Sequence, residues 1–285
     1  MSTSTLLLSQ TRRYGSFYSG LTRRLNRLRF DVSYRCRRLQ AVLRELGVSV
    51  EGRRVMDVGF GAGDLLASFP VSCALVGVDV SASAVDGARN DARFRRYAAA
   101  RFFTVPESHP ERLPEKHADI IVTSHLLEHV PSDSLLLSAL FERLAPGGTL
   151  AVFVPIEEPD YIMFHRRNYS LQSIAERVEQ AGFTLLRVEG SMYVNGHVWK
   201  LLTIPSRRRW PVCGPLVDAL RMATLGALPH AALERLDRGL YHLGCGARQA
   251  LVIARREATP RERASAGLSQ RGEKAFTAWP LHRER

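Results

Sequence analysis

The sequence lacks any apolar run of the roughly 20 residues that a membrane-spanning helix needs. The three leucines at 6–8 are also too few for the apolar core of a secretory signal. The first acid is Asp31, and the segment before it is rich in Arg and Ser, as in organelle transit peptides. We expect an amphipathic helix of the folded protein there, no transmembrane segment, and at most peripheral contact with a membrane.

Cysteine is scarce and scattered. The four cysteines are Cys36, Cys73, Cys213 and Cys245, with no C-x-x-C pair and no metal-ligand spacing. Such spacing indicates neither a disulfide framework nor a structural zinc site. We therefore expect a reduced, cytoplasmic protein whose thiols are buried or incidental.

Lysine is also rare, with three among the 40 basic residues, and the net charge of +12 lies at the two ends of the chain. Residues 1–50 hold ten basic and two acidic side chains, and residues 255–285 hold eight and four. The region between them is neutral, unlike a domain whose own groove follows phosphates. This distribution argues against nucleic acid as the partner. The 285 residues can bury one core, with or without an appended subdomain.

The most informative segment is VMDVGFGAGDLL at 55–66, which predicts a strand, a tight turn and a helix. Gly59, Gly61 and Gly63 suit the turn because glycine accepts positive φ and lets a ligand lie against the main chain. A following helix start would offer free N–H groups to an anionic group. Asp57 at the strand end can accept hydrogen bonds from an ammonium or a hydroxyl.

The glycine spacing suits two cofactors unequally. A dinucleotide fingerprint requires G-x-G-x-x-G/A, but Asp64 occupies the sixth position here. The arrangement D-x-G-x-G-x-G instead resembles the first motif of the Rossmann-like (class I) S-adenosylmethionine-dependent methyltransferases. An ordinary turn with glycines for tightness is the plain structural alternative.

Later segments extend this resemblance. The apolar stretch 74–80 ends with Asp79, twenty residues after Gly59, where a carboxylate meets an adenosine ribose. The phrase ADIIVTSHLLEHVPS (118–132) resembles the fourth strand and following loop of the branch that includes ubiquinone biosynthesis enzymes. L-x-P-G-G before the strand 149–155 is another recurring signature of the family.

The resemblance implies an α/β fold: a doubly wound, mostly parallel seven-stranded sheet with helices on both faces. We expect strands at 55–58, 74–80, 101–105, 118–123, 149–155, 184–189 and 249–256, the last antiparallel at the sheet's edge. We expect helices after the glycine loop, from a cap at 81–84 beginning with Ser81 to about residue 97, over 135–148 where a Pro-Gly-Gly turn ends the helix, and over 170–183. Gly47 is expected to end the N-terminal helical segment. The expected domains are an N-terminal helical lid (1–50), the Rossmann-like domain (51–256) with a helical insertion (191–246), and a disordered tail (257–285).

The resemblance also implies S-adenosyl-L-methionine as the cofactor, with a set of contacting residues. They are Asp57, Gly59, Phe60, Gly61, Gly63, Asp79, Val80, Ser124 and His125. In this family the N-terminal helices often close over the cofactor, so Tyr14, Phe17 or Tyr18 are candidates for that lid. For most of the arginines in the N-terminal segment, the simpler interpretation is that they are solvated side chains on a helix that packs against the core.

The predicted function is methyl transfer to a small-molecule or glycan acceptor, with O-methylation favoured. A hydroxyl acceptor must lose a proton, and His is suited to accept it because its ordinary pKa lies near 6.5. His125, His165 and His129 are the candidate bases, and each of them can equally be structural. H-L-L-E-H differs from the H-E-x-x-H of metalloproteases, so no metal is expected. The alternatives are an NAD(P)-dependent oxidoreductase, a nucleic-acid methyltransferase or binding protein, and a non-catalytic relative of the fold.

Overall fold

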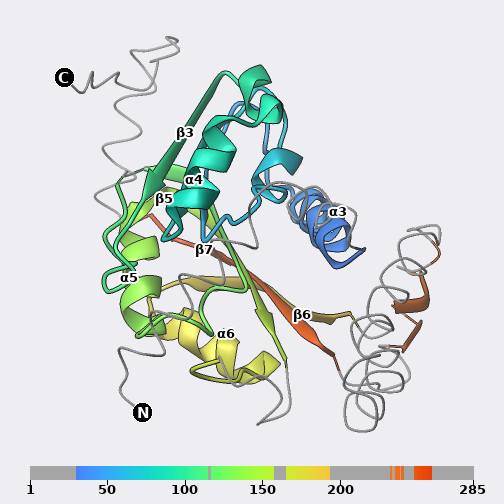
Figure 1. The fold of residues 1–285 in the computed structure, drawn as a ribbon. Helices are drawn as coiled ribbons and strands as arrows, with labels where there is room; N and C mark the ends of the chain where they lie inside the picture. Colours follow the sequence, from blue (N-terminus) through green and yellow to red (C-terminus); the bar gives the residue numbers. More distant parts are fainter. Residues whose placement is uncertain are drawn as a thin grey trace, which may run out of the picture.

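The protein is built on one seven-stranded sheet, seen in the computed structural model of Figure 1. The structure describes residues 30–114, 117–156, 165–192, 232, 235–237, 239–240 and 247–258. The strands are β1 (Arg54–Val58), β2 (Ala74–Asp79), β3 (Ala99–Thr104), β4 (Ala118–Ser124), β5 (Leu144–Pro155), β6 (Thr184–Ser191) and β7 (Gln249–Arg255). The described helices are α3 (Phe30–Glu45), α4 (Ala82–Arg89), α5 (Asp133–Arg143) and α6 (Leu171–Gln180), with 3₁₀ turns η1 (Leu66–Ser68) and η2 (Ala92–Arg96).

The strand order is β3-β2-β1-β4-β5-β7-β6, and only β7 runs antiparallel to its neighbours. The predicted doubly wound, mostly parallel sheet is therefore confirmed. The expected place of the reversed strand was wrong: β7 lies between β5 and β6, and β6 forms the edge. The sequence QALVIAR explains this, because six of its seven residues are buried, as in a strand covered on both faces.

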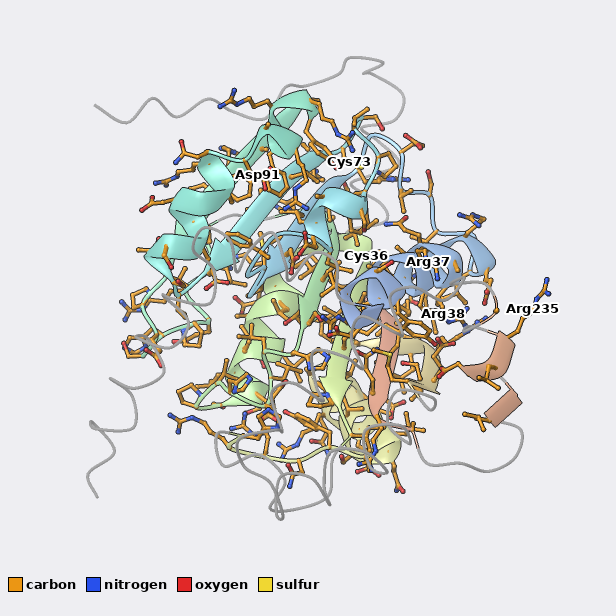
Figure 2. The ribbon with its side chains drawn as sticks, turned by 45° about the vertical axis from the view of Figure 1, so that its right-hand side comes forward. Cys36, Arg37, Arg38, Cys73, Asp91 and Arg235 are labelled. Atoms are coloured by element: carbon orange, nitrogen blue, oxygen red, sulfur yellow. The ribbon has the colours of Figure 1, made fainter. Side chains whose placement is uncertain are left out.

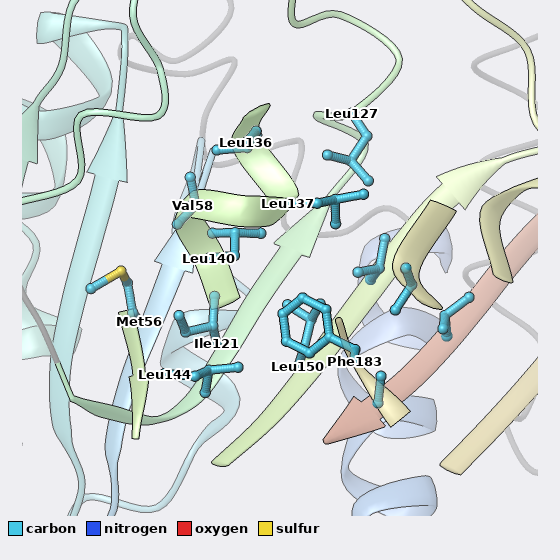
Figure 3. Packing of buried hydrophobic residues seen from close by; sticks show 14 of the residues in the cluster. Met56, Val58, Ile121, Leu127, Leu136, Leu137, Leu140, Leu144, Leu150 and Phe183 are labelled. Carbon is cyan, nitrogen blue, oxygen red and sulfur yellow. The ribbon is translucent and has the colours of Figure 1, made fainter. Parts of the chain in front are cut away.

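Two apolar layers cover the two faces of the sheet. Helices α5 and α6 bury Leu136, Leu140 and Ile174 against one face, the cluster shown in Figure 3. Helices α3 and α4 bury Leu39, Leu43 and Val85 against the other. Alternation along β1 divides its side chains between these layers, with Val55 on the α3 side and Met56 and Val58 on the α5 side.

Three predicted helices have different bounds in the structure. The glycine loop leads only into the single turn η1, because Phe69 precedes Pro70 and adopts the extended conformation that a following proline favours. The helix from 81 is capped by Ser81 as predicted, but it ends at Arg89, and Asp91 caps the separate turn η2. The helix expected over 135–148, with a Pro-Gly-Gly turn at its end, is α5 (Asp133–Arg143), and the chain enters β5 at Leu144, just before that turn.

Helix α3 is tied to the far edge of the sheet. Arg38, labelled on α3 in Figure 2, donates to both carboxylate oxygens of Glu189 on β6 at 2.6 Å. Gly47, with φ +67°, ends the segment as predicted. Of the predicted N-terminal lid, Tyr14, Phe17 and Tyr18 lie outside the described residues.

Most of the predicted insertion and all but the first residues of the predicted tail also lie outside the described residues. Within the insertion, residues 235–237 are helical, and Asp237 is buried. Its Oδ2 accepts hydrogen bonds from the Tyr34 hydroxyl of α3 (2.8 Å) and from Met192 N (3.1 Å). Among the described residues, no helix has the length and apolar character to cross a bilayer.

Candidate cofactor and acceptor site

The glycine loop bends back over the end of β2. Gly59, Gly61 and Gly63 all have positive φ (79°, 54° and 75°), and Gly59 N donates to Val78 O at 2.7 Å. A Cβ on Gly63 would lie 2.8 Å from Cζ of Phe94, and one on Gly59 would lie 3.1 Å from Cδ2 of Leu126, so neighbouring side chains leave little room for a Cβ at either position. The loop therefore requires glycine both for its positive φ and for its packing.

A half-buried arginine fixes the shape of this loop. Arg93 Nη1 lies 2.6 Å from Asp64 Oδ1, and Nη2 donates to Ala62 O at 3.0 Å. The same guanidinium also pairs with Asp91 at 2.9 Å. From the other side, Cys36 Sγ of α3 donates to Asp64 O at 3.5 Å. Asp64, which breaks the dinucleotide fingerprint, is therefore the anchor of the loop.

Asp79 lies where the sequence placed it, next to the glycine loop. Its Oδ2 accepts from Gly61 N and its Oδ1 from Ser81 N, both at 2.9 Å. Burial raises the pKa of the carboxyl, and these main-chain N–H groups oppose the rise. Each oxygen keeps a further lone pair that can accept from a hydroxyl.

Asp57 is the most perturbed acid of the site. It is buried at the end of β1, and among the described residues its Oδ1 has no hydrogen-bond partner. Burial, reinforced by the charge of Asp79, raises the pKa of Asp57 to about 8. A buried polar atom without a partner costs about 1–3 kcal/mol, and such sites recur where a ligand completes the structure. A ligand ammonium would supply the missing partner.

Helix α3 adds two charged residues that the sequence analysis did not single out. Arg35 lies 3.5 Å from Asp31, one helical turn earlier, and both side chains are largely buried. The positive charge of Arg35 lowers the pKa of Asp57 and that of His125. The sequence did contain a signal for this pair: Asp31 is the first acid in an Arg-rich segment, and Arg35 follows it at the i,i+4 spacing of a helical ion pair.

His125 is held through its main chain and through one nitrogen of its ring. The residue has φ +54°, and its N donates to Phe153 O of β5 at 2.9 Å. Its Nε2 lies 3.1 Å from Gln249 Oε1, and Gln249 in turn donates to Ser191 Oγ at 3.0 Å. Nδ1 lies 3.5 Å from Glu128 Oε1. Burial, then the charge of Arg35, lowers the pKa of His125 to about 3, so the imidazole is neutral at physiological pH.

The other two candidate bases lie together, across Glu128 from His125. The rings of His129 and His165 meet edge to face with centroids 4.9 Å apart. Glu128, fully buried, has its Oε1 3.9 Å from His129 Nε2. Sequence reasoning proposed all three histidines, but it singled out neither Glu128 nor Gln249, which is 124 residues from His125 in the chain.

Comparison with known proteins places this arrangement in a family. Residues 28–188, more than half of the chain, match the family model described as a methyltransferase domain. The chain belongs to this methyltransferase family. A relative from Mycolicibacterium smegmatis, named "Probable S-adenosylmethionine-dependent methyltransferase", is 29% identical over 163 residues, which cover 54% of this chain and 60% of the relative.

Two further relatives carry more specific names. The trans-aconitate 2-methyltransferase of Methylobacterium radiotolerans is 36% identical over 38% of this chain and 41% of its own length. The ubiquinone biosynthesis O-methyltransferase of Vibrio atlanticus is 32% identical over 34% and 41%. The chain thus spans between 41% and 60% of these methyltransferases. Among solved structures, the [4+2]-cyclase SpnF has the same fold, with a TM-score of 0.50 and 20% identity over 78% of this chain and 81% of that one.

The residues predicted to contact S-adenosyl-L-methionine around the glycine loop, Asp57 and Asp79 among them, lie together in this methyltransferase domain. The family, the fold and the cofactor predicted from the sequence are confirmed. The Rossmann-like core presents its polar side chains beyond the carboxyl ends of β1, β2 and β4, where ligands bind in open α/β sheets.

The remaining predicted cofactor residues of this methyltransferase domain differ in how they face the site. The Phe60 ring is buried against Phe102, with ring centroids 5.5 Å apart, so the Phe60 side chain packs in the apolar core beneath the glycine loop. Val80 follows Asp79 and is half-buried. Ser124 ends β4 and pairs with Phe153 in register. Their contacts with a bound cofactor remain predictions.

Proposed function

We propose that this protein transfers the methyl group of S-adenosyl-L-methionine to an oxygen atom of a small-molecule or glycan acceptor. One observation carries the proposal: two buried acids, Asp57 and Asp79, lie at a glycine loop with positive φ at Gly59, Gly61 and Gly63. The resulting cradle combines an acceptor for an ammonium, acceptors for hydroxyls and a turn that has no side chains at these three positions.

Each part of the cradle has a role in the proposal. Asp57 binds the ammonium of the methionine moiety, and Asp79 accepts from the ribose hydroxyls while Gly61 N and Ser81 N hold it in place. The glycine loop packs against the cofactor through its main chain. When bound, the cofactor supplies an electrophilic methyl on sulfur, so the protein's task is to align the acceptor, which can contribute up to about 7–11 kcal/mol.

The acceptor side is assigned to the histidines beyond β4. A hydroxyl acceptor must lose its proton, and His129 and His165 lie at this edge with their rings in contact. His125, bonded to Gln249 and facing Glu128, acts as a positioning residue. The Vibrio atlanticus relative, an O-methyltransferase by name, supports oxygen as the methylated atom.

The first test is calorimetry with S-adenosylhomocysteine and, separately, NADH. We expect the former to bind and the latter not to. Asp79→Ala should weaken S-adenosylhomocysteine binding by more than about 100-fold, because the two main-chain donors and the ribose lose a charged acceptor. Asp86→Ala, an exposed acid on α4, is the matched control and should bind as the wild type does. Equal affinities in the two variants would contradict the ribose assignment.

The acceptor is then found with cofactor labelled in the methyl group. Small-molecule, glycan, protein and nucleic-acid fractions are offered separately to the purified chain. Label that enters small molecules or glycans, in a base-stable ether linkage, is the expected result. Label that enters only protein or nucleic acid would contradict the proposed acceptor class.

A further inference from the structure

The acceptor side of the site contains a cluster with metal-binding chemistry. One ligand atom from each of Glu128, His129 and His165 lies within 4.8 Å of the other two. Two imidazoles and one carboxylate form the ligand set that proteins use for zinc and for non-haem iron, with further positions left open. The geometry points to a divalent transition-metal site formed by these three side chains.

The spacing of the ligand atoms is close to what a metal requires. Ligand distances of about 2.0–2.2 Å place neighbouring ligand atoms roughly 3–4 Å apart. Glu128 Oε1 and His129 Nε2 are already 3.9 Å apart, so closing the cluster requires side-chain movements of only about 1 Å. The two histidine rings meet edge to face, with an angle of 75° between their planes.

The two loops that supply the ligands are bound to each other through their main chains. Arg166 N donates to Glu128 O at 2.8 Å, and Arg166 Nε donates to His129 O at 3.0 Å. Arg167 donates to the carbonyls of Leu127, Val130 and Pro131, each at 2.5–2.9 Å. These bonds hold His165 against residues 128–129, although 36 residues separate the two segments.

The charges around the cluster are compatible with a cation. The guanidinium groups of Arg166 and Arg167 are directed at main-chain carbonyls, and that of Arg167 also lies 3.8 Å from Asp133. Glu128 is a fully buried carboxylate surrounded by imidazoles. A divalent cation at the cluster would be attracted to this carboxylate.

The metal would act on the acceptor, and this role, unlike metal binding itself, rests on the proposed function. The cluster lies beyond the end of β4, with the predicted cofactor residue Ser124 four residues before Glu128. Its open positions would bind an acceptor hydroxyl and favour the ionised oxygen, as metals do for bound water. The ligand set differs from H-E-x-x-H, because the third ligand comes from a separate loop.

The test is a cobalt(II) titration of the full chain after treatment with a chelator, followed by visible absorption. We expect one Co²⁺ per chain, with d–d bands that Zn²⁺ abolishes. His165→Asn and Glu128→Gln should each weaken Co²⁺ binding by more than about tenfold. His109→Asn is the matched control, because His109 forms an exposed pair with Glu111 at 3.1 Å and should leave Co²⁺ affinity unchanged.

The outcomes separate this inference from the proposed function. Wild type without a Co²⁺ spectrum at millimolar metal, or equal affinities in wild type and His165→Asn, would overturn the metal site even if S-adenosylhomocysteine binds. Co²⁺ binding without S-adenosylhomocysteine binding would support the site and contradict the proposed function. His165 is only half-buried in a loop, so its variant keeps the test valid if Glu128→Gln does not fold.

Discussion

The two halves of the site are built in different ways. The cofactor half, at the ends of β1 and β2, uses main-chain groups and acids that are close in sequence: Gly61 and Asp79 are 18 residues apart. The acceptor half, beyond β4, is held by side chains from distant segments, as in the bond between His125 and Gln249, 124 residues apart. The first half suits a fixed ligand common to a family, and the second can change with the acceptor.

The largest effect on stability and cofactor binding is expected from a substitution in the glycine loop, which belongs to the cofactor half. Gly63→Ala and Gly52→Ala both place a side chain at positive φ (75° and 67°), but only at Gly63 would the Cβ meet another atom, Phe94 Cζ at 2.8 Å. Gly52→Ala should cost about 1 kcal/mol, and Gly63→Ala about 1–3 kcal/mol more through overpacking.

Urea unfolding measures both free energies, and calorimetry should show a loss of more than tenfold in S-adenosylhomocysteine affinity for Gly63→Ala alone. Phe94→Leu in the Gly63→Ala background should recover part of the stability. Equal costs at the two glycines would mean that the loop has room that the structure does not show.

A second prediction concerns Asp57, whose folded-state pKa of about 8 lies above its ordinary 3.8. Because its pKa is raised on folding, the protonated Asp57 carboxyl stabilises the folded state below about pH 4, and this stabilisation is lost as the pH rises through 8. An asparagine at this position does not ionise, so the Asp57→Asn variant does not lose stability in this way. The variant should therefore gain stability relative to the wild type between pH 5 and pH 9, by about 1–3 kcal/mol, while S-adenosylhomocysteine binds more weakly.

Thermal unfolding of both proteins at pH 5 and pH 9 checks the sign, with Asp86→Asn as an exposed control. If the difference in stability between the two proteins is the same at pH 5 and pH 9, the pKa of Asp57 is not raised in the folded protein. Proton release on S-adenosylhomocysteine binding at pH 7, measured in buffers of different ionisation enthalpy, is the corresponding expectation for the wild type.

The smallest effect is expected in the acceptor half. Because the Gln249 amide donates to Ser191, its oxygen accepts from His125 Nε2–H. Nitrogen NMR should therefore show His125 as a neutral Nε2–H tautomer from pH 5 to pH 8. Gln249→Met should mix the two tautomers and leave S-adenosylhomocysteine affinity within about twofold. An unchanged tautomer in this variant would remove Gln249 from its positioning role.

The sequence predicted the elements whose causes are local. Ser81 capped α4 as expected, and Asp79 met the glycine loop at the predicted spacing. The helix after the loop was wrong because Pro70 limits the segment to the turn η1, a local signal that was present in the sequence. Ser170 caps α6 within the predicted 170–183 helix.

The rest depended on contacts across the chain. No pattern near His125 indicates Gln249, and no pattern near Glu128 indicates that Arg166 and Arg167 bring His165 beside it. The position of β7 was wrong for a related reason: an apolar strand can pair at an edge or within a sheet, and only the partners on both sides decide.

Because β7 lies inside the sheet, its position also determines the order in which the strands can pair while the chain is synthesised. Among the strands, β6 pairs only with β7, and β7 is the last of the seven along the chain. During synthesis on the ribosome, β6 therefore waits without a neighbour until residues 249–255 have emerged, whereas β1 and β2, which carry Asp57 and Asp79, can assemble earlier. A chain that ends before residue 249 would have these strands beside an unfinished sheet, a form prone to join another chain through its open strands.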